Sequence, residues 1–331
     1  MIKGEAVFKG ETEVKYLFQK SATSQSLVVV FSAFGAEGKP PAYNYLRALE
    51  GYDCNKLYIL DDFGCRASYY LCENRDFYIE RSVISLIKQI VRDNNINHVI
   101  SCGSSKGGYA AIYYGIKYGF DSIIAGSPQY LLGDYLFNGS SLADVSGFIS
   151  GGSDTQDKDF LNAILQDAVR SSNSSSKIYL HVGKGEYHYN HHVKPLIEEL
   201  NKKGIQYVLD LGDYANHADV AKYFPEYLKQ TISEETGVPY IKLLHEPSPT
   251  VKVNEQHEFH AHSSDPASTF AWYIYKDGKT IEKRMYTTSN KTTITFDEAG
   301  QYQLKVFVKN NANRKVTAKS RIINVKEAPS G

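Results

Sequence analysis

The sequence predicts an α/β domain, in which a mostly parallel sheet is covered by helices on both faces, followed by a small all-β domain. Between residue 27 and about residue 236, strand-like apolar runs alternate with helical patterns, as they do in parallel sheets. After the Pro-Ser-Pro-Thr sequence at 247–250, short segments with period-two alternation and turn signals take over. The 331 residues are enough for both domains.

The first domain is expected at 1–240, a linker at 241–250 and the all-β domain at 251–331. The stretch 6–17 alternates like an edge hairpin. Apolar runs predict the strands of the sheet at 27–31, 57–60, 97–102, 122–125, 177–182 and 206–210. Amphipathic patterns predict helices at 79–92, 106–119, 157–169, 192–203 and 218–235, and Gly204 is expected to cap the fourth of them.

Residues 130–172 interrupt this alternation with Gly/Ser/Asp-rich sequence. We expect a cap-like insertion over the active site that selects the substrate, and a surface excursion without a role is the alternative.

In the second domain, strands are expected at 269–275, 292–296 and 301–308, with turns at 276–279 and 297–300. This spacing predicts an antiparallel β-sandwich of immunoglobulin-like type. Alternation puts Trp272 and Tyr273 on opposite faces, so one of them is expected in the core. The sandwich could bind glycan through Trp272, Tyr273 and Tyr275, but we favour packing or dimerisation.

Composition narrows the functional classes. Basic and acidic residues number 37 each, so the net charge is zero and nucleic-acid binding is not expected. No apolar run approaches the length of a membrane span and the N-terminus carries no signal core, so we expect a cytoplasmic protein. The cysteines lack CxxC spacing and predict reduced thiols instead of a zinc site or disulfides; they are Cys54, Cys65, Cys72 and Cys102.

The chemistry is carried by Gly103-Ser104-Ser105-Lys106-Gly107, which matches GxSxG between a predicted strand and a predicted helix. This context is typical of a nucleophile elbow, where a strained turn exposes the serine and the helix N-terminus faces the developing oxyanion. Ser105 is the expected nucleophile. Ser104, on the strand side, is the alternative hydroxyl, and a turn that only reverses the chain is the non-catalytic alternative.

A serine nucleophile needs a histidine base and a carboxylate that orients it. In α/β-hydrolases the chain order is serine, acid, histidine. His217 follows the last predicted strand of the sheet and is the expected base. Glu186, in Gly183-Lys184-Gly185-Glu186, is the expected acid, and Asp213 is its rival because it lies close to His217 in sequence.

The oxyanion hole needs two N–H donors. We expect one from the backbone of Lys106 and one from the loop after the first central strand, at Ala33 or Phe34. No metal is expected, because the remaining candidate histidines have no accompanying carboxylate arrangement; they are His181, His188, His191 and His192.

Three segments resemble a known family. Phe31-Ser32-Ala33-Phe34-Gly35, Asp61-Asp62-Phe63-Gly64 with Ser68-Tyr69-Tyr70, and Ser104-Ser105-Lys106-Gly107-Gly108 are together similar to bacterial α/β-hydrolase-type carbohydrate O-acetyltransferases. Those enzymes act on capsular polysaccharide or on the glycans of accessory-secretion glycoproteins. The resemblance covers residues 25–235, and the C-terminal part resembles a triple-tyrosine immunoglobulin-like module that mediates contacts.

The resemblance implies acyl transfer through an acyl-Ser105 intermediate, with Glu186 and His217 as the other members of a triad. The expected acceptor is a sugar hydroxyl of a polysaccharide or glycan, and the expected donor is acetyl-CoA, with no bound cofactor. With water as acceptor the same groups would make an esterase. A non-catalytic protein that binds a glycan or a partner is the further alternative, and a homo-oligomer or protein partner is expected through the sandwich.

Overall fold

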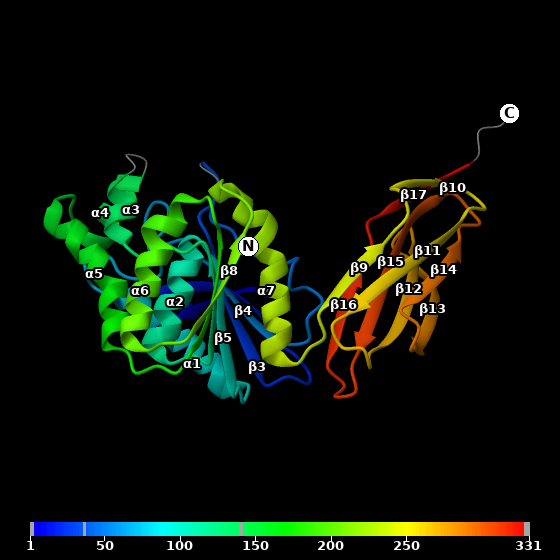
Figure 1. Cartoon of the computed structure of the whole chain (residues 1–331), viewed down its shortest axis with the longest axis horizontal. Helices are drawn as coiled ribbons and strands as arrows, with labels where there is room; N and C mark the ends of the chain where they lie inside the picture. Colours follow the sequence, from blue (N-terminus) through cyan, green and yellow to red (C-terminus); the bar gives the residue numbers. More distant parts are fainter. Residues whose placement is uncertain (1–2, 36–37, 139–141, 328–331) are drawn as a thin grey trace. The chain divides into compact units, whose positions relative to one another are not determined.

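The computed structural model describes residues 3–35, 38–138 and 142–327 (Figure 1). The chain divides into two compact units, which are described separately below. The first comprises the residues up to 46 together with 54–231, and the second comprises 47–53 together with the residues from 232 onward.

An eight-stranded sheet forms the centre of the first unit, in the order β1-β2-β4-β3-β5-β6-β7-β8. Its first three strands are joined by antiparallel pairing, and from β4 to β8 every neighbouring pair is parallel. The strands are β1 (Glu5–Lys9), β2 (Glu13–Gln19), β3 (Ser26–Phe31), β4 (Asn55–Ile59), β5 (His98–Ser104), β6 (Ser122–Gly126), β7 (Lys177–Gly183) and β8 (Tyr207–Gly212). The predicted edge hairpin and mostly parallel sheet are confirmed.

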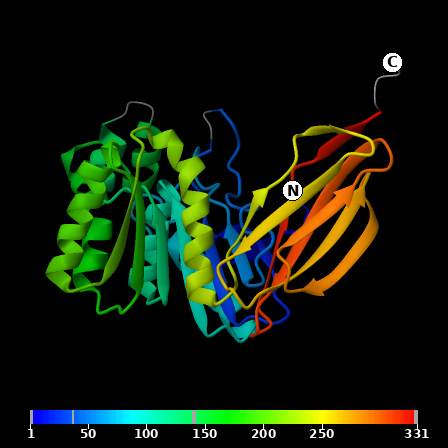
Figure 2. The same cartoon turned by 45° about the vertical axis from the view of Figure 1, so that its right-hand side comes forward.

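Helices cover both faces of this sheet. They are α1 (Tyr78–Asp93), α2 (Lys106–Tyr118), α3 (Leu132–Phe137), α4 (Ala143–Ser150), α5 (Thr155–Ser171), α6 (Lys194–Lys203) and α7 (Val220–Thr236). Because α1, α2, α5 and α6 connect parallel strands that advance in one direction, right-handed crossovers put them on the same face. Figures 1 and 2 show them there, with α7 on the opposite face. Phe224 of α7 packs against Gly126 at the end of β6.

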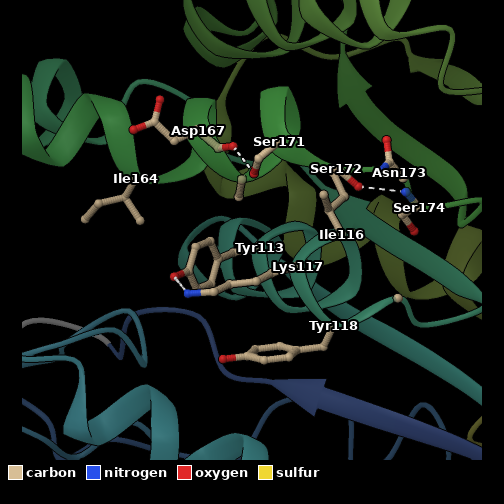
Figure 3. Close-up of a pocket in the computed structure, with 12 residues that line it drawn as sticks. Tyr113, Ile116, Lys117, Tyr118, Ile164, Asp167, Ser171, Ser172, Asn173 and Ser174 are labelled. Atoms are coloured by element: carbon tan, nitrogen blue, oxygen red, sulfur yellow. Dashed lines mark hydrogen bonds between the residues drawn. The ribbon is translucent and has the colours of Figure 1, made fainter.

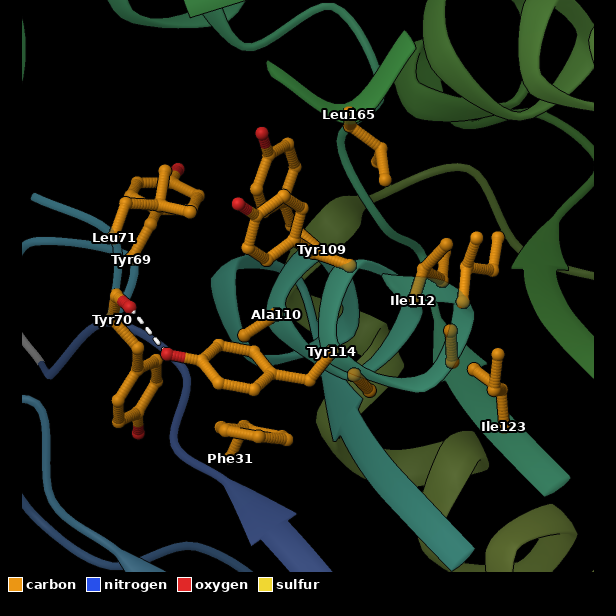
Figure 4. Packing of buried hydrophobic residues seen from close by; sticks show 14 of the residues in the cluster. Phe31, Tyr69, Tyr70, Leu71, Tyr109, Ala110, Ile112, Tyr114, Ile123 and Leu165 are labelled. Atoms are coloured by element: carbon orange, nitrogen blue, oxygen red, sulfur yellow. Dashed lines mark hydrogen bonds between the residues drawn. The ribbon is translucent and has the colours of Figure 1, made fainter. Parts of the chain in front are cut away.

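Helix α2 is the most enclosed of these elements, since every residue from Lys106 to Ile116 is buried. Its apolar side chains pack against β3 on one side and against α5 on another. Figure 4 shows Tyr114 lying beside Phe31, and its hydroxyl donates to the carbonyl oxygen of Tyr70 over 2.6 Å. The helix that follows Ser105 is therefore held rigidly from several directions.

The segment 130–172 contains α3, α4 and α5 in its described part. Helix α5 begins with a capping box between Asp154 and Asp157, and Leu161 and Leu165 join the core against α2. Helix α5 is thus the crossover helix between β6 and β7. The Gly/Ser-rich sequence on either side of it did not predict this role. A cap role for the rest of the segment stays a prediction.

The start of the predicted helix at 192–203 differs from the structure. Residues Tyr189–Val193 form a turn of π-helix before α6, so the regular helix begins at Lys194 and not at 192. Helix α6 ends as predicted, with Gly204 in the left-handed region at φ 69°. No helix in the described part of the chain is long and apolar enough to cross a membrane. The four cysteines are free thiols.

The second unit consists of two β-sheets, in which all strand pairs are antiparallel except β10 with β17. One sheet has the order β10-β17-β15-β12-β13 with β16 beside β15, and the other has the order β14-β11-β9. The strands are β9 (Ile241–His245), β10 (Thr250–Lys252), β11 (Gln256–Ser263), β12 (Thr269–Lys276), β13 (Lys279–Thr287), β14 (Lys291–Thr295), β15 (Gly300–Lys309), β16 (Lys315–Lys319) and β17 (Ile323–Lys326).

The structure differs from the expected linker at 241–245, because these residues form β9 and pair with β11. Trp272 is buried and Tyr273 is half-buried, as the alternation predicted. The immunoglobulin-like and triple-tyrosine assignments stay predictions.

Candidate active site

Ser105 occupies a strained turn between β5 and α2. Its backbone has φ 51° and ψ −121°, a conformation that residues other than glycine rarely adopt. A Cβ at Gly103 would lie 2.4 Å from the carbonyl oxygen of Gly107, and a Cβ at Gly107 would lie 2.3 Å from that of Phe31. Both glycines of the motif are therefore required, because strand and helix approach more closely than a side chain allows.

The structure brings Ser105, His217 and Glu186 together in one chain of hydrogen bonds. His217 Nε2 lies 3.0 Å from Ser105 Oγ, and His217 Nδ1 lies 2.7 Å from Glu186 Oε2. Glu186 stands in the turn after β7, and His217 opens a short 3₁₀ turn after β8. Since β5, β7 and β8 are parallel, their carboxyl ends meet at one edge of the sheet and place the three side chains within reach.

Glu186 is fully buried, yet its carboxylate is well satisfied. Oε1 accepts hydrogen bonds from Ser127 Oγ over 2.6 Å and from the Gly183 N–H over 2.8 Å. Burial by itself raises the pKa of Glu186, but the hydrogen bonds from His217, Ser127 and Gly183 outweigh it and lower the pKa below its usual value. Glu186 is therefore held as a carboxylate that accepts the Nδ1 proton of His217.

The rival residues have other partners. Asp213 forms an ion pair with Lys184 over 2.8 Å, and its side chain is 89% exposed. Ser104 Oγ lies 2.5 Å from the hydroxyl of Tyr45, on the strand side of the elbow. His181 contacts Asp210 through Nδ1 and Tyr214 through Nε2. Within the described part of the chain, none of these three side chains forms a hydrogen bond with Ser105 or His217.

The two sides of the expected oxyanion hole differ in how their N–H groups are used. Lys106 is the first residue of α2, where backbone N–H groups have no acceptor within the helix. In the loop after β3, the Ala33 N–H donates to Asn44 Oδ1 over 2.9 Å. Because the N–H of Ala33 already donates to Asn44, Phe34 remains the expected second donor of the oxyanion hole.

A buried ion pair links the three segments on which the family resemblance rests. Lys106 Nζ lies 2.7 Å from Asp61 Oδ2, with side chains 1% and 0% exposed. Asp61 Oδ1 accepts from both the N–H and the hydroxyl of Ser68, and the Tyr70 hydroxyl contacts the N–H and hydroxyl of Ser32. Burial lowers the pKa of Lys106, and Asp61 opposes this effect. The pair ties the start of α2 to the loop after β4, and Tyr70 links that loop to Ser32 after β3.

Two further side chains lie at the site: Gln129, which no motif predicted, and His188, which was considered only as a metal ligand. Gln129 Nε2 lies 3.0 Å from Ser105 Oγ and 3.0 Å from His188 Nε2. The ring of His188 stacks on that of His217, with centroids 3.9 Å apart and an interplanar angle of 8°. Nothing in the local sequence marks Gln129, although its position just after β6 is at the same edge of the sheet as Ser105.

Glu186, His188 and His217 bring possible ligand atoms within 4.8 Å of one another. The hydrogen bonds of the site use most of these atoms. Both ring nitrogens of His217 are engaged with Ser105 and Glu186, and His188 Nε2 contacts Gln129. This arrangement matches a hydrogen-bonded proton relay, so we assign no metal to it.

Two grooves of about 580 Å³ lie on the first unit. The first, shown in Figure 3, is lined by residues such as Tyr113, Lys117 and Ser171 at the far end of α2, about 18 Å along the helix from Ser105. The second begins at Phe34 and includes Lys39 and Arg66. Of these two grooves, the second is the one that includes an expected oxyanion-hole residue, Phe34, whose ring centroid lies 5.8 Å from Lys106 Nζ.

No protein-family model matches the chain, and no curated protein matches it in sequence. Solved structures do resemble it. The capsule O-acetyltransferase of Neisseria meningitidis serogroup A, in a complex of a variant with CoA, is 24% identical over 70% of this chain and 96% of that chain, with a TM-score of 0.60.

Two other solved structures are similar to this chain over a comparable share of its length. The Glycosylation Associate Protein (Gap123) complex from Streptococcus agalactiae is 19% identical over 71% of this chain and 47% of that chain, with a TM-score of 0.60. FphF, a fluorophosphonate-binding serine hydrolase of Staphylococcus aureus, is 13% identical over 70% of this chain and 97% of that chain, with a TM-score of 0.53. The chain therefore has an α/β-hydrolase-like fold followed by antiparallel β-sheets, which confirms the predicted fold class.

Proposed function

We propose that the protein is a serine acyltransferase that moves an acetyl group to a hydroxyl of a polysaccharide or glycan. The observation that carries this proposal is the continuous hydrogen-bonded path from Ser105 through His217 to Glu186 at a strained elbow. In this path His217 is the general base, and Glu186 selects its tautomer and balances the charge that forms on it.

In the first half-reaction, Ser105 Oγ attacks the acyl carbon and its proton passes to His217 Nε2. The negative charge on the acyl oxygen is stabilised by the backbone N–H groups of Lys106 and Phe34. Collapse of this intermediate expels the donor's leaving group, which takes the proton from His217, and leaves acyl-Ser105.

In the second half-reaction, the acceptor hydroxyl attacks acyl-Ser105 and gives its proton to His217. The bond between the acyl carbon and Oγ then breaks, and the proton on His217 restores the serine hydroxyl.

We propose acetyl-CoA as the donor. The complex of the N. meningitidis capsule O-acetyltransferase with CoA supports this choice, since that protein shares the fold. The groove that begins at Phe34 supports it further, because Lys39 and Arg66 outnumber its one carboxylate, Asp144, and cationic side chains suit phosphate groups. A capsular or protein-linked glycan is the proposed acceptor by the same likeness.

Esterase activity is the second candidate. It would use the same three residues with water as acceptor, and the similarity to the serine hydrolase FphF favours it. A non-catalytic binding role is the third and requires that the hydrogen-bonded path be inert. For the second unit we propose a contact role toward a second copy or another protein, in line with its exposed apolar side chains Ile281, Met285 and Leu244.

The test is to incubate the protein with a fluorophosphonate and, separately, with acetyl-CoA and a panel of bacterial oligosaccharides, and to read both by mass spectrometry. We expect labelling of Ser105 and acetylation of one glycan, both lost in Ser105→Ala and His217→Ala. Rapid hydrolysis of short acyl esters without glycan acetylation would replace the transferase by the esterase. No labelling of a folded protein would refute both.

A further inference from the structure

Gln129 touches the oxygen atom that would carry the acyl group. Its side chain is fully buried, and its Nε2 lies within 3.0 Å of both Ser105 Oγ and His188 Nε2. The protons that Ser105, His217 and His188 carry decide how this amide can act.

Ser105 has one hydroxyl proton. His217 donates from Nδ1 to Glu186, because an ionised carboxylate only accepts, and so its Nε2 is the nitrogen that accepts the proton of Ser105. Because Ser105 gives its only proton to His217, its Oγ can only accept a hydrogen bond from Gln129. The amide must therefore present its NH₂ group to the serine, not its carbonyl oxygen.

The same NH₂ group has a second proton, which points to His188 Nε2. This nitrogen must be unprotonated to accept it, so His188 is the neutral imidazole with its proton on Nδ1. The geometry agrees with a neutral ring, since His188 is buried and lies flat against His217 at 3.9 Å. Burial also lowers the pKa of His188 to about 3.

We infer that Gln129 is a further catalytic residue, whose amide donates to Ser105 Oγ and stabilises the negative charge that develops on this oxygen. His188 is the positioning residue that aims the amide. This inference rests on the proposed function.

The charge on Ser105 Oγ grows twice in the cycle. It grows when the hydroxyl proton passes to His217 during attack, and again when the acyl–Oγ bond breaks and its electron pair returns to Oγ. A hydrogen bond to a charged acceptor is about twice as strong as one to a neutral acceptor, so the amide stabilises these states more than the resting hydroxyl.

The experiment measures inactivation by a fluorophosphonate, separated into the maximal rate kinact and the half-saturating concentration KI. In this reaction Ser105 Oγ forms a bond to phosphorus, fluoride leaves, and the serine proton passes to His217 and is lost with fluoride. Gln129→Met keeps the length of the side chain and removes the donor. We expect kinact to fall about 10- to 100-fold, with KI changed less than about twofold.

Two substitutions of His188 separate its hydrogen bond from its stacking. His188→Gln can place an acceptor oxygen where Nε2 stands, and we expect kinact within about threefold of the wild type. His188→Phe keeps a flat ring against His217 but has no acceptor, and we expect a loss like that of Gln129→Met. In the double variant Gln129→Met/His188→Phe, kinact is expected to fall no further than in either single variant, because both substitutions remove the same contribution of the Gln129 amide.

The outcomes distinguish this inference from the proposed function. A wild type labelled at Ser105 together with an equally reactive Gln129→Met overturns the inference alone, and so does an effect confined to KI. A folded wild type that is not labelled at Ser105 overturns both. If Gln129→Met does not fold, equal reactivity of His188→Gln and His188→Phe is the result that decides against the inference.

Discussion

The buried ion pair between Lys106 and Asp61 predicts a large loss of stability that a second substitution restores. Their side chains are 1% and 0% exposed, and the charged atoms lie 2.7 Å apart. Removing one partner of such a pair leaves an unpaired buried charge and costs about 3–5 kcal/mol. Asp61→Asn keeps the side-chain shape and an acceptor for Ser68, so we expect a loss of about 3 kcal/mol.

Lys106→Met leaves the Asp61 carboxylate without its cation, and we expect a loss of about 3–5 kcal/mol. The double variant Lys106→Met/Asp61→Asn contains no buried charge at this point, and the introduced amide can still accept from Ser68. We therefore expect it to be more stable than either single variant.

The chain offers an internal reference for this measurement. Its only tryptophan, Trp272, lies in the second unit, whereas helices α1 to α6 lie in the first. Urea unfolding followed by circular dichroism at 222 nm thus reports the first unit, and tryptophan fluorescence reports the second. With a slope of about 3 kcal/mol per molar urea, a loss of about 3 kcal/mol lowers the first midpoint by about 1 M.

The fluorescence midpoint is expected to stay unchanged in all three variants. A shift of the first midpoint smaller than about 0.3 M in Asp61→Asn would refute the reasoning. So would a double variant whose loss equals the sum of the two single losses, because independent residues add and a coupled pair does not.

Three further predictions concern the elbow and the relay. Glu186→Gln is expected to slow fluorophosphonate labelling of Ser105 by about 10³- to 10⁴-fold, because the amide no longer selects the tautomer of His217 that can act as a base. In the control Asp213→Asn, the labelling rate of Ser105 should stay within about twofold of the wild-type rate. Gly107→Ala should lower the free energy of unfolding of the first unit by about 3 kcal/mol or more, because its Cβ would meet a backbone carbonyl of β3 at 2.3 Å. The control Gly204→Ala has φ 69° but open space, and should cost only about 1–2 kcal/mol in the same urea titration. Burial lowers the pKa of His188 to about 3 in the folded protein, against about 6.5 in the unfolded chain. Below pH 6.5 the unfolded chain therefore binds more protons, and the free energy of unfolding falls as the pH drops, by at most about 1.4 kcal/mol per pH unit. His188→Gln should therefore lose less stability than the wild type between pH 6.5 and pH 4, and an identical loss would contradict the buried neutral state.

The sequence alone led to the fold class and to the elbow, because both depend on local rules. Alternating apolar runs and helical patterns predict crossovers in a parallel sheet, and a strained turn between glycines has a short-range signature. The order of residues along the chain also led to His217 and Glu186. It left Asp213 open as the acid, since proximity in sequence does not say which way a side chain points.

The rest was decided only by the tertiary structure. Gln129 and Ser105 follow the ends of two neighbouring parallel strands and meet only because the carboxyl ends of β5 and β6 share one edge. Lys106 directs its side chain inward to Asp61, 45 residues away, although a lysine at a helix start is usually solvated. Strand β9 has mostly exposed residues, so only its pairing with β11 reveals it. These contacts join residues that are distant in sequence, and each depends on which strands lie side by side, a property that no local pattern carries.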